Sequence, residues 1–138
     1  MEIRRITDIQ EVLRCLPYER EIRKKGRDTS RESQLLLFVQ SQLENPYFAF
    51  FIAYDDDKNI LGYTVAFVSI IKGLGNRVHL SRLYAPKKEV FDALTDALRD
   101  WVKPYNVKTA QITAYKHIKA IQRRYKFTPV SVCMERRI

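Results

Sequence analysis

The sequence predicts a single α/β domain, in which a mixed (α+β) sheet carries helices on both faces. Its 138 residues suit one compact domain, and its apolar fraction of 46% is ordinary for a globular protein. Segments with helical spacing and segments typical of strands follow one another in the order β α α β β β α β α β. Helices placed between strands in this way are expected to cover both faces of the sheet.

The N-terminal part begins with one strand and one helix. Residues 2–6 alternate weakly between polar and apolar side chains, as a short strand does. Residues 7–16 place apolar side chains at helical spacing, and Thr7 or Asp8 would cap this helix. Pro17 is expected to end the helix, and the polar segment that follows is expected to be a connection.

A second helix and a hairpin come next. Residues 33–45 form a helical pattern that Pro46 stops. The aromatic run 47–54 and the apolar run 60–71 flank the polar turn "DDDKN". Two such runs around a polar turn indicate an antiparallel β-hairpin.

The C-terminal half is predicted to alternate strands and helices. Residues 78–85 are expected to form a strand and residues 86–103 a long amphipathic helix. Residues 107–115 alternate like a strand, and residues 116–125 form a short basic helix. A last strand is expected within residues 128–137.

Charge is the most unusual property of the composition. The chain has 25 Lys and Arg against 16 Asp and Glu, a formal net charge of +9. Such an excess favours acidic partners such as nucleic acid, a phosphorylated cofactor or an acidic protein surface. Two basic segments, "REIRKKGR" and "YKHIKAIQRRYK", either bind such a partner or are solvated surfaces. The residues selected as candidate contacts are Arg23, Lys24, Lys25, Arg123 and Arg124.

Other features argue against a membrane, secretion or a metal site. No apolar run approaches the roughly 20 residues needed to span a bilayer, and the first residues lack the apolar core of a signal peptide. Cys15 and Cys133 fall within apolar patterns, so we expect reduced, packed thiols in a cytoplasmic protein. The turn "DDDKN" lacks the ligand spacing of a calcium loop, and no metal is predicted.

Three stretches in order resemble the GNAT superfamily of acyl-CoA-dependent N-acyltransferases. They are "FFIAYDDDKNILGY", "VHLSRLYAP" and "WVKPYNVKTAQITAYKHIKAIQRRYKF" with the closing "TPVSVCMERRI". The resemblance implies that strands 78–85 and 107–114 lie side by side, run parallel and splay at their C-terminal ends. Acetyl-CoA would lie in the gap, against Leu83, Tyr84 and Ala85. The residues expected in the core are Leu80, Leu83, Phe91, Leu94, Leu98, Trp101, Ala110 and Ile112.

The sequence departs from that family where the cofactor's phosphates would bind. The family wraps the pyrophosphate with a glycine-rich loop, because a side chain would keep phosphate away from the backbone N–H groups. Here the segment is "APKKEVF", which has no glycine, and Lys87 and Lys88 are the groups that could hold phosphate by charge.

Residues that the family uses for catalysis are also replaced. Its helix tyrosine, glycine and asparagine correspond to Gln122, Lys126 and Tyr115, and Gln122 cannot protonate a thiolate. Tyr125 is interpreted as a packing residue. His79 and Glu89 are the candidates for a general base.

The sequence leaves three functions as hypotheses. The favoured one is a non-catalytic or atypical binding module for nucleic acid or a partner protein, similar to small GNAT-like bacteriophage proteins of the virion. The alternative is an active N-acetyltransferase that uses Lys87 and Lys88 in place of the glycine loop. A third possibility is a regulatory subunit that pairs with an active partner through the sheet edge.

Overall fold

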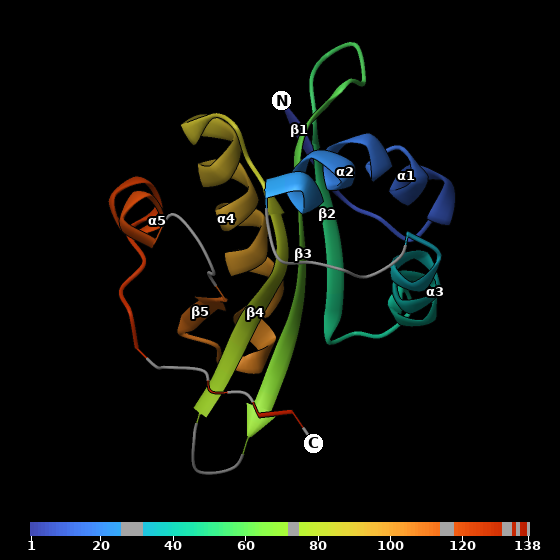
Figure 1. Ribbon diagram of the computed structural model, residues 1–138. Helices are drawn as coiled ribbons and strands as arrows, with labels where there is room; N and C mark the ends of the chain where they lie inside the picture. Colours follow the sequence, from blue (N-terminus) through green and yellow to red (C-terminus); the bar gives the residue numbers. More distant parts are fainter. Residues whose placement is uncertain (26–31, 72–74, 114–117, 131–133, 135, 138) are drawn as a thin grey trace.

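The computed structural model describes residues 1–25, 32–71, 75–113, 118–130, 134, 136 and 137 (Figure 1). Its helices and strands are β1 Glu2–Arg5, α1 Ile9–Leu13, α2 Leu16–Lys25, α3 Glu32–Gln42, β2 Phe48–Tyr54, β3 Ile60–Ile71, β4 Gly75–Tyr84, α4 Lys88–Val102, the 3₁₀ turn η1 Lys103–Tyr105, β5 Thr109–Ile112 and α5 Ile118–Tyr125. Within this part of the chain, no helix is both long and apolar enough to cross a bilayer.

The strands form one mixed sheet in the order β1-β2-β3-β4-β5. β1 to β4 pair antiparallel with their neighbours, and β5 joins β4 in parallel. The expected hairpin of β2 and β3 is therefore confirmed, and so is the parallel pair formed by the fourth and fifth strands. A parallel neighbour requires a crossover connection, which α4 provides.

Helices cover both faces of the sheet, as the sequence predicts. Successive side chains of β2 point to opposite faces, so Phe50 and Ile52 pack in one core and Phe51 and Ala53 in the other. The first core lies under α1, α2 and α3, and the second lies under α4 (Figure 1). Because both of its faces are covered, β2 is buried along its whole length.

The long helix α4 lies close against β2 and β3. Val90, Leu94, Leu98 and Val102 recur every fourth residue and are all buried. The close approach requires glycine at position 62, because a Cβ there would lie 2.5 Å from the carbonyl oxygen of Tyr84 and 2.6 Å from Cγ1 of Val90. The start of α4 is thereby fixed beside the end of β4.

The expected core is confirmed in all but one residue. Leu80, Leu94 and Leu98 are buried, while the partly buried residues that pack against the same cluster include Leu83, Phe91, Trp101 and Ile112. Ala110 is exposed, so its assignment to the core was wrong. It lies on the short edge strand β5, where the described chain provides no further strand to cover it.

Two other expectations needed correction. Pro17 does not end a helix; it lies in the first turn of α2, where proline is tolerated because its missing N–H would have no intrahelical partner. Residues 18–25 of the segment expected to be a connection are thus helical, while residues 26–31 lie outside the described part of the chain. The closing strand is absent from the described residues among 128–137, while residues 131–133 and 135 lie outside the described part of the chain.

Candidate functional site

The β4 strand continues beyond the end of β5, which is paired with it along its whole length; the expected splaying of the two strands stays a prediction. Their ladder runs from Arg77 opposite Thr109 to Leu80 opposite Ile112, whereas β4 continues to Tyr84. A β-bulge in the pairing of β4 with β3 lies just past the end of this ladder, because Ser81 has no partner on β3 while the residues on either side do. The last residues of β4 therefore have no neighbour on β5.

The connection from this open end to α4 is short. Ala85 is buried, Pro86 is exposed, and Lys87 is the N-cap residue, with φ −116° and ψ 146° and no capping hydrogen bond from its side chain. These three residues leave no room for a loop that could surround a pyrophosphate.

The two lysines do not converge on a common point. Lys87 is exposed, and Nζ of Lys88 lies 2.7 Å from Oδ2 of Asp92, one helical turn along α4. This hydrogen bond raises the pKa of Lys88, so the ammonium stays charged. Both side chains of the pair are more than half exposed, and such pairs contribute little to stability.

Helix α5 closes the open end of β4 instead. The hydroxyl of Tyr125 donates a hydrogen bond of 3.1 Å to the carbonyl oxygen of Ala85. Nη2 of Arg124 donates to the same oxygen at 3.2 Å, and also to the carbonyl oxygen of Pro86. The Tyr125 ring packs on Phe91, with 4.3 Å between ring centroids. The interpretation of Tyr125 as a packing residue is confirmed, and its hydroxyl has a role that the sequence did not reveal.

A buried polar cluster holds the other side of β4. Glu19 of α2 is 3% exposed; its Oε1 accepts 2.6 Å from the Tyr63 hydroxyl and its Oε2 accepts 3.1 Å from Nε of Arg82. Burial, followed by the Glu19 charge, raises the pKa of Tyr63 well above its usual value. Beside the cluster, the rings of Tyr18 and Tyr84 pack with centroids 4.8 Å apart. The cluster therefore ties the last residues of β4 to α2.

Sequence analysis missed this cluster because its members lie 44 and 63 positions apart. Glu19 also fell in the segment expected to be a connection. The only local signal was an acidic residue next to Tyr18, with the apolar Cys15 and Ile22 at helical spacing from it.

The two candidates for a general base lie on opposite sides of the sheet. His79 stacks on Phe67, with centroids 5.2 Å apart, and its neighbours Val78 and Leu80 point toward α4. His79 therefore faces away from α4, whose first turn carries the exposed Glu89. The structure does not bring the two side chains together.

The residue at the family's glycine position keeps a glycine-like backbone. Lys126 has φ +61°, and its N–H donates to the carbonyl oxygen of Gln122 at the end of α5. Glycine is favoured at such a helix end because it has no Cβ. Lys126 thus adopts a backbone conformation that glycine would adopt more readily.

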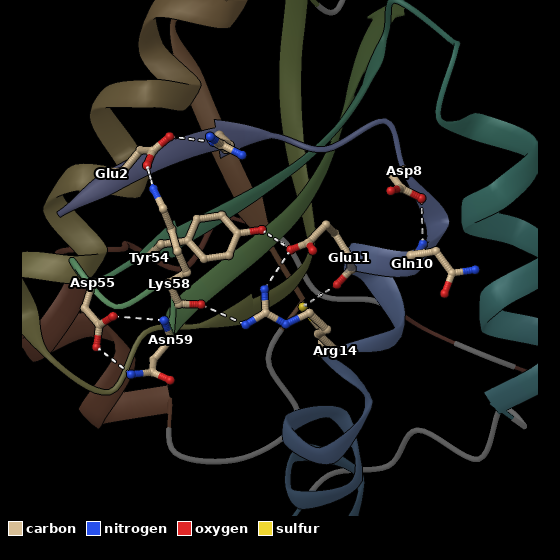
Figure 2. Close-up of polar contacts among 11 residues, drawn as sticks. Glu2, Asp8, Gln10, Glu11, Arg14, Tyr54, Asp55, Lys58 and Asn59 are labelled. Atoms are coloured by element: carbon tan, nitrogen blue, oxygen red, sulfur yellow. Dashed lines mark hydrogen bonds and ion pairs between the residues drawn. The ribbon is translucent and has the colours of Figure 1, made fainter.

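The acidic turn between β2 and β3 is organised by its own hydrogen bonds. Oδ1 of Asp55 accepts from the N–H group of Asn59 (Figure 2) and from that of Asp57, and these hydrogen bonds, with that of Asn59 contributing most, lower the pKa of Asp55. Lys58 bridges the turn to Glu2, and its carbonyl oxygen accepts from Arg14, the C-cap residue of α1 (Figure 2). Across the described chain, no group of three or more His, Cys, Asp or Glu could hold a metal ion.

The basic candidates lie on two elements. Arg23, Lys24 and Lys25 belong to the last turn of α2, and their side chains lie outside the described part. Arg123 is exposed on α5, whereas Arg124 is engaged at the end of β4. Of the two arginines on α5, Arg124 is hydrogen-bonded to the connection that follows β4, and Arg123 is exposed without such a bond.

Comparison with known proteins gives a consistent fold. No protein-family model matches the chain, and no curated protein matches it significantly. Among solved structures, a predicted acetyltransferase with acetyl-CoA from Clostridium acetobutylicum superposes with a TM-score of 0.75 at 15% identity, over 99% of this chain and 95% of that one.

Two further structures cover nearly the whole chain. One is AAC(6')-Iy in complex with a bisubstrate analogue, CoA-S-monomethyl-acetylneamine, with a TM-score of 0.72, 17% identity and coverage of 99% and 98% of the two chains. The other is an aminoglycoside acetyltransferase from an uncultured soil metagenomic sample, in complex with trehalose, with a TM-score of 0.73, 15% identity and coverage of 99% and 95%. At these identities the likeness establishes the fold.

Proposed function

The chain has the fold of the GNAT acetyltransferases, and we propose that it serves as a binding module for an acidic partner, nucleic acid or protein, rather than as an efficient acetyltransferase. The observation that carries the proposal is the engagement of the Ala85 carbonyl oxygen by Tyr125 and Arg124. This oxygen lies at the open end of β4, where the family would place the pantetheine arm of its cofactor.

The geometry of that end explains why cofactor binding should be weak. An extended pantetheine arm would pair with strand backbone, so it would have to displace the hydrogen bonds from α5. The pyrophosphate would then meet a connection of three residues that contains no glycine. The Lys88 side chain points along α4 toward Asp92. A phosphate would therefore be attracted mainly by solvent-exposed charges, which bind weakly.

The partner class follows from charge. A formal net charge of +9 attracts polyanions and acidic protein surfaces, and the exposed Arg123 adds to it on α5. A location in a phage virion remains a proposal, which rests on the resemblance of the sequence to small GNAT-like phage proteins.

One observation favours the alternative of an active N-acetyltransferase. A structural neighbour of the chain is a predicted acetyltransferase with acetyl-CoA. In this alternative Lys87 and Lys88 would hold the pyrophosphate. Changing both to glutamate would then abolish cofactor binding, while their charge would suit the N-terminus of α4 and leave the fold stable.

The proposal is tested by incubating the protein with acetyl-CoA and each of a panel of primary amines and polyamines. Chromatography measures the free CoA that is released. We expect no release above the rate without protein. Sustained release that is lost in the Lys87→Glu/Lys88→Glu variant would establish the alternative and overturn the binding module.

A further inference from the structure

We propose that an open face of the sheet, centred on Phe67 and His79, binds single-stranded nucleic acid by base stacking. The inference rests on the proposed function, because it names the partner class and the surface of the same binding module. The surface comprises two transverse rows of side chains from β3, β4 and β5: Phe67, His79 and Gln111, and Ser69, Arg77 and Thr109.

Register places these side chains on one face. Phe67 is opposite His79 on β4, and His79 is opposite Gln111 on β5. The flanking residues Ala66 and Val68 are buried in the core under α4, so Phe67 points to the other face. Alternation along each strand then puts the second row beside the first.

The helices on this side of the sheet stop short of the open face. Phe38 of α3 packs edge-on against Phe48 of β2, with centroids 6.2 Å apart. Phe67 is the next residue in that transverse row, and it is 39% exposed. Exposed apolar surface with a polar rim is typical of binding sites, and the polar side chains in the two rows around Phe67 provide such a rim.

The exposed ring is stacked on its neighbour across the strands. Phe67 and His79 stack with centroids 5.2 Å apart and an angle of 26° between their planes. A preorganised pair of rings suits an unstacked base, because every base presents a flat π-surface to an aromatic side chain. A duplex keeps its bases covered, so this surface should prefer single strands.

The charge around the rings fits the same partner. Arg77 lies in the neighbouring row and can contact a phosphate, whereas Ser69, Thr109 and Gln111 offer hydrogen-bonding groups. The six side chains include no carboxylate, and the chain carries a net charge of +9. An anionic chain of stackable groups matches this combination better than a basic or purely apolar partner does.

Fluorescence anisotropy with a labelled thymidine single strand of about 15 nucleotides, a length within known site sizes, tests the proposal. We expect the unaltered protein to bind this strand more tightly than the matching duplex at low salt. Phe67→Ala should weaken binding by about 5-fold or more, since stacking of one base accounts for at least that factor. Phe67→Tyr, which keeps the ring, should bind within about 2-fold of the original protein.

Ile70→Ala is the matched control. Ile70 is 55% exposed on the same strand but lies on the face of Val68, toward α4, so its removal should leave binding unchanged. Thermal melting shows whether each variant is folded. Should Phe67→Ala unfold, Phe67→Leu keeps an apolar side chain without the flat ring and should show the same loss of affinity.

Arg77→Gln separates the phosphate contact from stacking. It should lower the slope of log affinity against log salt concentration by about 1, because one phosphate contact fewer releases one counterion fewer. Absence of binding to any nucleic acid at low salt would overturn the proposal. So would binding that Phe67→Ala leaves intact, or binding lost only on neutralising Arg123 and Arg124.

The result of the nucleic-acid binding assay does not depend on whether the protein uses acetyl-CoA. Turnover of acetyl-CoA would contradict the binding module without changing the Phe67 result. Loss of nucleic-acid binding, or preferential binding of polyglutamate, would contradict the open-face proposal and leave a protein partner for the module.

Discussion

The hydroxyl of Tyr125 and the carbonyl oxygen of Ala85 lie 3.1 Å apart, so the last helix is bonded to the strand end that it would otherwise leave open. Arg124 bonds to the same oxygen and to Pro86. These contacts give one backbone acceptor two donors from α5. A ligand that pairs with the end of β4 must therefore break protein hydrogen bonds before it forms its own.

Opening this contact should improve cofactor binding. In the double variant Tyr125→Phe/Arg124→Gln, the hydroxyl donor is removed and the guanidinium is replaced by a shorter amide. We expect acetyl-CoA to bind about 5-fold more tightly than to the original protein, because a net hydrogen bond is worth about 1 kcal/mol. Calorimetric titration measures the change, and Arg123→Gln is the charge-matched control. Equal affinity of the double variant and the original protein would mean that α5 does not compete.

The buried carboxylate of Glu19 should contribute substantially to the stability of the fold. Glu19→Ala leaves Arg82 and Tyr63 without their common partner, and we expect a loss of about 3 kcal/mol in the free energy of unfolding. Urea denaturation measures it. Glu44→Ala, at an exposed position, should change stability by less than about 0.5 kcal/mol. A similar small effect at Glu19 would show that its ion pair contributes little.

The left-handed residue at the end of α5 should prefer glycine. Lys126 has φ +61°, a conformation that a side chain makes less favourable, so Lys126→Gly should stabilise the fold by about 0.5–1 kcal/mol. Ala120→Gly, within the same helix, should destabilise it by about 1 kcal/mol. A higher melting temperature for Lys126→Gly and a lower one for Ala120→Gly would confirm the backbone conformation. A lower melting temperature for both variants would refute it.

The thiol of Cys15 should be inert in the folded protein. It is 1% exposed, and burial raises its pKa from 9.0 to about 12. Because the folded pKa exceeds the unfolded one, the contribution of this group to stability is complete below about pH 9 and is lost as the pH rises toward 12. In a Cys133→Ala background, a thiol reagent at pH 8 should react only after denaturant is added. Immediate reaction would contradict the burial.

The fold could be predicted because its main signals are local. The hairpin of β2 and β3 follows from two apolar runs around a polar turn, and α4 follows from apolar residues repeating every fourth position. α2 was missed because Pro17 normally disfavours helix, although the first helical turn tolerates it. Ala110 was misassigned because alternation along a strand cannot show whether the strand lies at an edge.

The candidate site was harder to predict because its contacts are long-range. The sequence pattern predicted that Lys87 and Lys88 lie at the start of α4, and the structure confirms this. It could not show that Lys88 pairs with Asp92, or that Tyr125 reaches back 40 positions to Ala85. The Glu19 cluster joins three elements in the same way, and only the tertiary structure brings such partners together.

Calorimetric titration of the unaltered protein with acetyl-CoA at physiological salt tests the central claim, that the fold has kept its architecture but not a working cofactor site. We predict no measurable binding, or a dissociation constant of roughly 200 μM or weaker, which corresponds to about 5 kcal/mol or less. Low-micromolar binding would contradict the claim, since it would require the cofactor to displace Tyr125 and Arg124 at little cost and to find its phosphate contacts without a glycine loop.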